Sequence, residues 1–443
     1  MSTAQKPSAT SATSATRATS ATRATSATRA TSATRATRFP ARSLRPGTLP
    51  GRAQQWLQRG VQRVTAAALG PYQTAIVRIG FSATWLLFLL RELPHRHELY
   101  GPQGPWGFDM GQQILADNGA FTVLIWNDST LWFELVYVLA IVSSALLLVG
   151  WRTRTMSVLF MIGVLSLMNR SVFMGDGGDN VIHLMAMYLV LTRCGQVWSL
   201  DARRVKAAGG VVAAVVRDRV GPALWTVLGV ALAVVTFLGL LSWGWALVFW
   251  ALLLAHLGWW AACRFADGEP RRLADVVANL VHNAGLLIII VEVCFVYATA
   301  GWYKVQGSRW QDGTAVYYPM NLDYFTPWPW LSEQLASHGT MVMLVTYGTV
   351  IVQVAFPFTL FNRRVKNVLL ALMIVEHASI AVLLGLPFFS LAMIAADAVF
   401  LPTVFLVWLG GRAGRLRDRV LPVSRTAPQR RPEAVEQPRT LVG

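Results

Sequence analysis

The sequence has few charged residues and few cysteines. Only 14% of its 443 residues are charged, whereas 54% are hydrophobic and 18 are Trp. In soluble globular domains about a quarter of the residues are charged, so this composition excludes an ordinary soluble domain and indicates a polytopic membrane protein. The three cysteines, Cys194, Cys263 and Cys294, fall in or beside apolar segments without paired spacing. They predict neither a disulfide framework nor a cysteine zinc site, and we expect no metal site.

Acidic residues are also scarce. The chain has 22 Asp and Glu against 39 Lys and Arg, which gives a net charge of +17. Such an excess would suggest a nucleic-acid partner if the basic residues shared one face of a soluble fold. They lie instead in short clusters between apolar runs, a pattern typical of the cytoplasmic loops of membrane proteins. We therefore expect a multi-pass chain in the lipid bilayer of the cell membrane, and no nucleic-acid partner.

The N-terminal segment lacks both acidic residues and an apolar run. Residues 9–38 repeat a six-residue unit of Ala, Thr and Ser with one Arg, and no acidic residue precedes Glu92. A hydrophobic core cannot be built from this composition, so residues 1–70 are predicted to be a disordered basic tail of low complexity. The tail has no apolar stretch of the kind found in signal peptides. It could contact anionic lipid head groups, remain solvated, or reflect a start codon predicted too early.

Ten apolar runs approach the length of about 20 residues that a membrane-spanning helix needs. The sequence therefore predicts an all-α polytopic bundle of about ten transmembrane helices in residues 71–410, with 223–263 as an inserted helix pair and 411–443 as a cytoplasmic tail. With ten crossings every basic cluster falls on one side of the membrane, which places both termini in the cytoplasm. The expected spans are 72–91, 131–150, 155–172, 179–193, 223–241, 243–263, 281–303, 340–361, 366–386 and 388–410.

Several ionisable residues lie inside these spans, where each costs at least about 2.5–3.5 kcal/mol on insertion scales and usually faces the bundle interior. Glu292 is expected to be protonated or paired across helices, with Arg78 or a histidine. His377 and Asp397 form a candidate pair if the last two spans make a hairpin. Interhelical hydrogen bonds that serve packing alone are the alternative. The ionisable residues are Arg78, Glu134, His183, His256, His282, Glu292, Glu376, His377 and Asp397.

The stretch GDGGDN at 175–180 joins two expected spans and contains Asp176, Asp179 and Asn180. Two carboxylates and an amide at this spacing could bind a cation. A tight turn in which Asn180 caps the following helix is the alternative.

Lys304 ends the seventh expected span, on the extracytoplasmic side. In a water-poor pocket a lysine can lose its proton and serve as a base, whereas at a membrane interface it can serve as an anchor beside aromatic residues. The segment after it is rich in Tyr, Trp and Pro and contains Arg309, Trp310 and Asp312. Such a segment is typical of the membrane interface, and we expect it to cover a cavity that opens outward.

Four stretches of the sequence, in this order, resemble the horizontally transferred transmembrane (HTTM) family. They are AIVRIGF with Arg78, NRSVFMGDGGDNVIHL, AGWYKVQGSRWQDG with Lys304, and EHASIAVLLGLPFF with His377. The resemblance covers roughly residues 70–410. That family is related to the membrane portion of vitamin K-dependent gamma-glutamyl carboxylase and to SdpB-like proteins, which assist maturation of a secreted peptide toxin.

The resemblance implies a catalytic role for two residues. In the carboxylase a lysine in a matching context deprotonates the vitamin K hydroquinone, and a histidine in a later span contributes. Lys304 and His377 match these positions, so the resemblance implies a reduced membrane quinone of the vitamin K type as the cofactor. The carboxylase also has a large lumenal domain, which has no counterpart here, so glutamate carboxylation is not expected to carry over.

Three functions remain open at this point. The first is a quinol-using lyase or oxidoreductase with an extracytoplasmic active site. The second is a non-enzymatic maturation or export partner of a small secreted peptide. The third is a transporter in which Glu292, His377 and Asp397 couple transport to proton movement.

Overall fold

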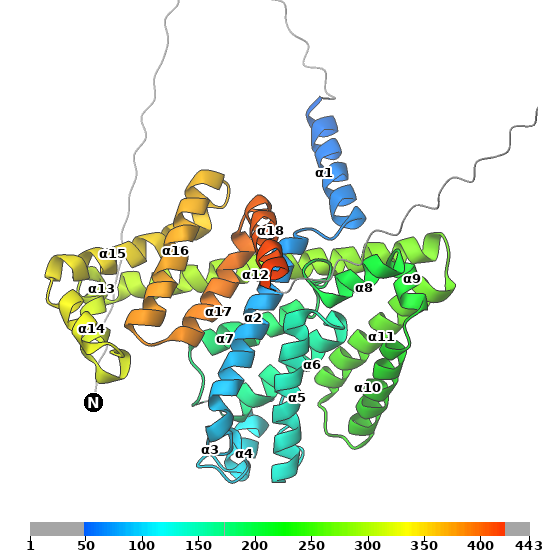
Figure 1. The fold of residues 1–443 in the computed structure, drawn as a ribbon, viewed down its shortest axis with the longest axis horizontal. Coiled ribbons are helices and arrows are strands. Elements are labelled where there is room, and N and C mark those ends of the chain that lie inside the picture. Colours follow the sequence, from blue (N-terminus) through cyan, green and yellow to red (C-terminus); the bar gives the residue numbers. More distant parts are fainter. Residues whose placement is uncertain (1–47, 172, 421–443) are drawn as a thin grey trace, which may run out of the picture. The chain divides into compact units, whose positions relative to one another are not determined.

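The computed structural model describes residues 48–171 and 173–420, and all regular secondary structure in this part is helical (Figure 1). Of the expected basic tail, residues 1–47 lie outside the described part, whereas α1 (Thr48–Ala66) is helical. Of the expected C-terminal tail, residues 421–443 lie outside the described part, and the residues before them belong to α18 (Thr403–Val420).

The remaining α-helices include both long and short elements. The long ones are α2 (Pro71–Glu92), α5 (Thr130–Val149), α6 (Thr153–Arg170), α10 (Val220–Phe237), α11 (Trp243–Phe265), α12 (Glu269–Gln306), α15 (Gly339–Ala355) and α16 (Arg363–Leu383). The short ones are α3 (Arg96–Tyr100), α4 (Phe108–Asn118), α7 (Gly177–Leu189), α8 (Leu200–Ala208), α9 (Val211–Val216), α13 (Ser308–Gln311), α14 (Pro329–Ala336) and α17 (Pro387–Asp397). Single turns of 3-10 helix are η1 (Leu93–His95), η2 (Ala315–Tyr317), η3 (Pro319–Asn321), η4 (Asp323–Phe325), η5 (Phe356–Thr359) and η6 (Ala398–Phe400).

Seven of the described helices are long and apolar enough to cross a membrane, which confirms a helical multi-pass membrane protein. These are α2, α5, α10, α11, α12, α15 with its extension to Thr359, and α16. The expected spans 155–172 and 179–193 correspond to α6 and α7. Arg154 and Arg170 near the two ends of α6 lower its mean hydropathy, and α7 has only 13 residues, so neither has the apolar length of a full crossing.

The expected span 388–410 is not one straight helix. It is formed by α17 with η6 and then α18, and these two parts bend by 120° at a short break. The break contains Pro402, which has no backbone N–H to donate and disfavours a helical conformation in the residue before it. If this bent pair counts as one broken span, the described part has up to eight. The count of ten and the orientation of the termini remain predictions.

The centre of the bundle is built from α2, α5, α6, α7 and α17. Helix α2 packs against α5 and α17, and α6 packs against α5 and α7. Close packing of α2 on α17 depends on Gly80, because a Cβ there would lie 2.4 Å from the Cβ of Ala395. On one side of this centre α16 packs against α17, α15 packs against α16, and α12 packs against α15.

Helices α10 and α11, the expected inserted pair, pack against each other, and α11 also packs against α12. None of the 18 described residues of α10 is buried. Its apolar surface, which includes Val227, Val230 and Val234, is therefore available to lipid.

The longest helix, α12, has 38 residues, which corresponds to about 57 Å at a rise of 1.5 Å per residue. Its first part holds the connection between α1 and α2. Asn283 donates to the carbonyl oxygens of Val64 (2.8 Å) and Ala67 (3.0 Å), and Nε2 of the buried His282 lies 2.8 Å from the carbonyl oxygen of Leu69. His282 is therefore a structural residue.

Candidate functional site

Lys304 lies at the C-terminal end of α12, on the same face as Tyr297 and Gly301, because residues three, four and seven apart share a helix face. Gly301 allows α15 to approach this face closely. A Cβ at Gly301 would lie 2.7 Å from Cγ2 of Val354 and 3.5 Å from its backbone. The neighbour of Val354 in sequence is Gln353, so the glycine brings an amide side chain up to the lysine.

Three side chains connect α12, α15 and α16 through hydrogen bonds. Lys304 Nζ donates to Oε1 of Gln353 (2.8 Å), and Nε2 of Gln353 donates to Oε1 of Glu376 (2.6 Å). Gln353 is only 5% exposed, and Lys304 and Glu376 are half-buried. Within the described residues Lys304 makes no ion pair, so the direct partner of its amine is a neutral amide. Trp310 covers the amine, with its ring centroid 5.2 Å from Nζ.

A second buried network joins α12, α16 and α17. The Tyr297 hydroxyl donates to Oδ1 of Asp397 (2.9 Å), and its oxygen lies 3.0 Å from Nε2 of His377. The three residues are each 2% exposed or less. When Asp397 is ionised it accepts the hydroxyl proton, and the His377 ring then donates from Nε2 and leaves Nδ1 as an acceptor. The expected pairing of His377 with Asp397 is therefore indirect and runs through Tyr297.

Two atoms of this network have no hydrogen-bond partner among the described residues, namely Nδ1 of His377 and Oδ2 of Asp397. Buried polar atoms are nearly always satisfied. The Tyr297 network therefore leaves hydrogen-bonding capacity unused at one ring nitrogen of His377 and one carboxylate oxygen of Asp397. Phe389 packs edge-on to the His377 ring at 5.7 Å between centroids, which keeps the surroundings apolar.

The two networks are neighbours in space because they share helices. Glu376 and His377 are consecutive on α16, and Lys304 and Tyr297 are two turns apart on α12. We call the six residues Tyr297, Lys304, Gln353, Glu376, His377 and Asp397 the polar strip. Sequence reasoning predicted four of its members and missed Tyr297 and Gln353. An amide inside an otherwise apolar span was the available signal for Gln353.

Arg78 lies apart from the polar strip and has a structural role. Its guanidinium is fully buried and donates to the carbonyl oxygens of Leu147, Leu148 (2.7 Å), Cys194 (3.2 Å) and Trp198 (2.8 Å). Leu147 and Leu148 end helix α5, where carbonyl groups lack partners in the helix itself. The side chain thus closes the end of α5 and fixes the loop before α8.

Glu292 does not form the expected pair with Arg78 or a histidine. Its side chain is half-buried, and within the described residues it makes no hydrogen bond or ion pair. Arg78 donates instead to four backbone carbonyl oxygens, and no contact between it and Glu292 occurs in the described part.

The GDGGDN stretch forms a helix cap. Asp176 accepts from the backbone N–H groups of Gly178 (2.7 Å) and Asp179 (3.0 Å), and the Asp179 side chain accepts from the Asp176 N–H (3.0 Å). This reciprocal arrangement is a capping box at the start of α7, so Asp176 rather than the exposed Asn180 caps the helix. Among residues 48–171 and 173–420, no three His, Cys, Asp or Glu side chains come close enough together to hold a metal ion.

The segment after Lys304 folds over α15. Arg309 and Asp312 form an exposed ion pair (3.4 Å), and the Tyr347 hydroxyl of α15 donates to the Gln311 carbonyl oxygen (2.8 Å). A hydrogen bond from the Thr314 hydroxyl, helped by the Arg309 pair, holds the pKa of Asp312 below its usual value. Arg309 and Asp312 thus shape this segment and do not enter the polar strip.

Two large cavities lie among the described residues, of about 750 and 480 Å³, and neither is lined by a residue of the polar strip. Comparison with family models, with curated proteins and with solved structures gives no match for this chain.

Proposed function

We propose that the chain is an HTTM-type membrane enzyme that uses a reduced quinone, with Lys304 as the base. The observation that supports this most directly is the neutral partner of the lysine. A carboxylate bound directly to the amine would favour its charged form, whereas the amide of Gln353 does so far less. Glu376 then lies one hydrogen bond further away, where its charge can balance a proton that Lys304 accepts at Nζ.

The polar strip has groups that fit a quinol. Nδ1 of His377 is a buried nitrogen without a partner among the described residues, which suits an O–H donor. The Phe389 ring packs against His377, and the Trp310 ring lies over the Lys304 amine. When bound, a reduced quinone supplies acidic hydroxyl groups and reducing equivalents. Lys304 would accept a proton, His377 would orient a hydroxyl group, and Gln353 would hold the amine in place.

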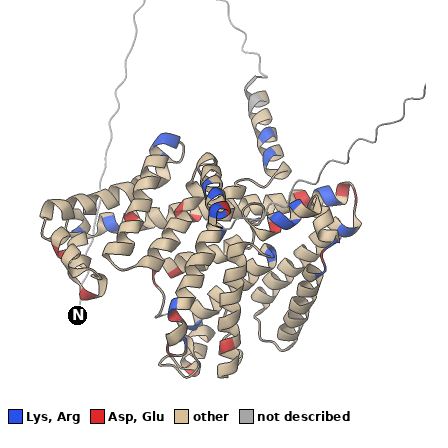
Figure 2. Cartoon of the chain, viewed as in Figure 1, with Lys and Arg blue, Asp and Glu red and all other residues tan. Residues whose placement is uncertain are grey.

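The proposed orientation places this site on the extracytoplasmic side, with both termini in the cytoplasm. Figure 2 shows that most Lys and Arg residues lie at helix ends and in the connections between helices. The clusters around Arg152, Arg204, Arg271 and Arg363 would all face the cytoplasm, in agreement with the positive-inside rule.

The test is a Lys304→Met variant in lipid nanodiscs, supplied with a reduced short-chain menaquinone and oxygen. We expect the wild-type protein to consume the quinol and the variant to lose at least a hundredfold in rate, the lower range for removal of a general base. Lys206→Met is the matched control, because Lys206 is exposed on α8 and should leave the rate unchanged. Mass spectrometry of lipid extracted from the purified protein would identify a bound quinone independently. Equal rates for Lys304→Met and wild type would refute the proposal.

A second candidate is a proton-coupled transporter. It is favoured by the buried Tyr297, His377 and Asp397 network next to the bent pair of α17 and α18, since broken helices beside ionisable groups are common in transporter sites. In proteoliposomes with a pH-sensitive dye, an Asp397→Asn variant should then abolish proton movement while Lys304→Met retains it. The enzyme proposal predicts no proton movement in either protein.

A further inference from the structure

The two large cavities adjoin each other, since they share six lining residues, and they differ in chemistry. The first, of about 750 Å³, lies between α5, α6, α10, α11 and α12 and is lined mainly by apolar side chains. The second, of about 480 Å³, lies at the starts of α6, α8 and α10, where arginine and aspartate side chains gather. The residues that line both are Arg154, Thr155, Arg193, Trp225, His256 and Trp259. The two cavities thus meet along these six residues, and we call the pair the amphipathic space, with the charged second cavity as its mouth and the apolar first cavity as its interior.

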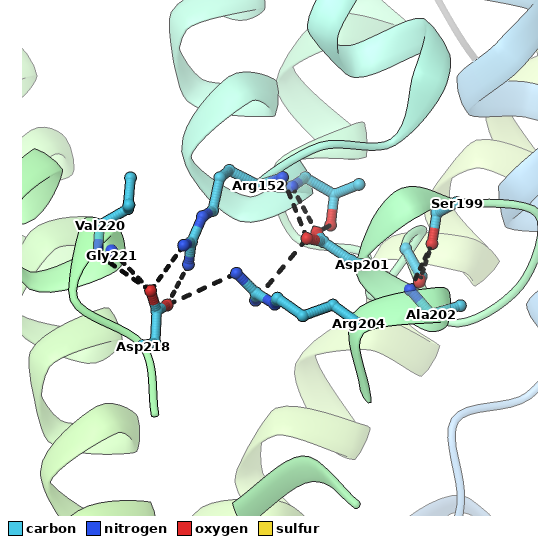
Figure 3. Close-up of polar contacts among 10 residues, drawn as sticks. Arg152, Ser199, Asp201, Ala202, Arg204, Asp218, Val220 and Gly221 are labelled. Atoms are coloured by element: carbon cyan, nitrogen blue, oxygen red, sulfur yellow. Dashed lines mark hydrogen bonds and ion pairs between the residues drawn. The ribbon is translucent and has the colours of Figure 1, made fainter. Parts of the chain in front are cut away.

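Most of the charges at the mouth are compensated. Arg152 makes a two-pronged ion pair with Asp218, and Arg204 lies between Asp218 (3.5 Å) and Asp201 (3.7 Å) (Figure 3). Burial alone would raise the pKa of Asp218, but the hydrogen bonds from Arg152 and from the Gly221 N–H outweigh burial and leave this pKa lowered. Asp218 is therefore ionised and neutralises its partners. Arg193 donates to Asn279 (2.6 Å) and lies 3.9 Å from Asp275.

Arg154 is the exception. Its guanidinium stacks over the Trp259 ring at 3.5 Å from the centroid. Within the described residues its side chain makes no hydrogen bond and no ion pair. A guanidinium has five N–H donors in a planar fork, and here they lie at the junction of the polar and apolar cavities without an acceptor.

We propose that this space binds an anionic phospholipid, with its phosphate on Arg154 and an acyl chain in the apolar cavity. Arginine binds phosphate through paired, charge-assisted hydrogen bonds, and basic pockets between transmembrane helices are typical sites for anionic head groups. The two volumes fall within the range of about 300–1,000 Å³ for ligand pockets. Helix α10, none of whose described residues is buried, leaves the apolar cavity next to the bilayer. The proposal is independent of the polar strip.

The experiment measures lipid retention by native mass spectrometry after the full-length protein is exchanged into nanodiscs of dioleoyl phosphatidylglycerol or dioleoyl phosphatidylcholine. We expect the wild-type protein to retain phosphatidylglycerol in preference to phosphatidylcholine. Arg154→Gln should lower that retention about fivefold, which is the effect of one basic residue near an anionic lipid surface. Arg264→Gln is the matched control, because Arg264 is exposed on α11 and lines neither cavity.

A second variant tests whether the apolar cavity holds the acyl chain of the lipid. Ala231 lines the apolar cavity from α10 and is exposed, so Ala231→Phe fills volume without disturbing a packed core and should also lower retention. Thermal unfolding in detergent checks that each variant is folded. Equal retention of the two lipids by the wild type, or unchanged retention by a folded Arg154→Gln variant, would overturn the proposal. Release of the lipid by millimolar inorganic phosphate would support the phosphate contact.

Discussion

The part of the polar strip formed by Tyr297, His377 and Asp397 depends on the tyrosine. Its single hydroxyl bridges Asp397 and His377, which come from two other helices. Neither the histidine nor the aspartate reaches the other directly, so each relies on the tyrosine for a partner. Interhelical hydrogen bonds of this kind contribute about 0.6–2 kcal/mol in membrane proteins, and loss of one partner leaves a buried polar group unsatisfied.

Tyr297→Phe removes this hydroxyl and keeps the ring. We expect the free energy of unfolding to fall by about 1–3 kcal/mol, because Oδ1 of Asp397 and Nε2 of His377 lose their partner in an apolar setting. The measurement is thermal or denaturant-induced unfolding in detergent micelles. Tyr303→Phe is the control, since Tyr303 lies on the same helix and is 75% exposed. Equal stability of the two variants would show that the bridge does not stabilise the fold.

At the scale of elements, the distance between α12 and α15 decides whether Lys304 reaches Gln353. Gly301 sets this distance, because Val354 packs where a Cβ would otherwise be. The hydrogen bond from Lys304 to Gln353 therefore depends on an apolar contact, in which the Val354 side chain packs against the backbone of Gly301.

Gly301→Ala should force α12 and α15 apart. We expect a destabilisation of about 1–3 kcal/mol, as for overpacked cores, and weaker quinol consumption under the conditions used for Lys304→Met. Gly348→Ala serves as the control, since a Cβ there meets nothing within 4 Å. A second change, Val354→Ala, should restore much of the loss in Gly301→Ala, because it removes the atom that clashes. Failure of this rescue would show that the damage arises elsewhere.

The elements could be predicted from the sequence to different degrees. Helices α5, α10 and α11 could be predicted because each corresponds to an apolar run of about the 20 residues that a membrane crossing needs. The bend before α18 was missed, although Pro402 was a visible signal. The meeting of Tyr297 with His377 and Asp397 was beyond sequence reasoning, because it depends on the rotation and tilt of three helices. The capping role of Asp176 was assigned to Asn180, since the sequence leaves several residues able to cap one turn.

For the whole molecule, the predicted orientation follows from charge alone and can be tested directly. Reporter fusions at residues 110 and 320 should be active only outside the cytoplasm, and a fusion at residue 210 only inside it. Residue 110 lies in α4 and residue 320 in η3, both outside the candidate spans. A cytoplasmic signal at residue 320 would move Lys304 to the inner face and would remove the argument for an extracytoplasmic active site.

Helix α12 runs without a break from the contacts of Asn279 and Asn283 to Lys304. It is about 57 Å long at 1.5 Å per residue, which exceeds the roughly 30 Å of hydrocarbon in a bilayer. Val277 and Val281 near its start line the apolar cavity, while Lys304 is two residues from its end. Because the helix is continuous, a tilt imposed at the lipid-facing start must displace the lysine as well. Under the two proposals made above, binding of a lipid near the start of this helix would therefore shift the proposed base near its end.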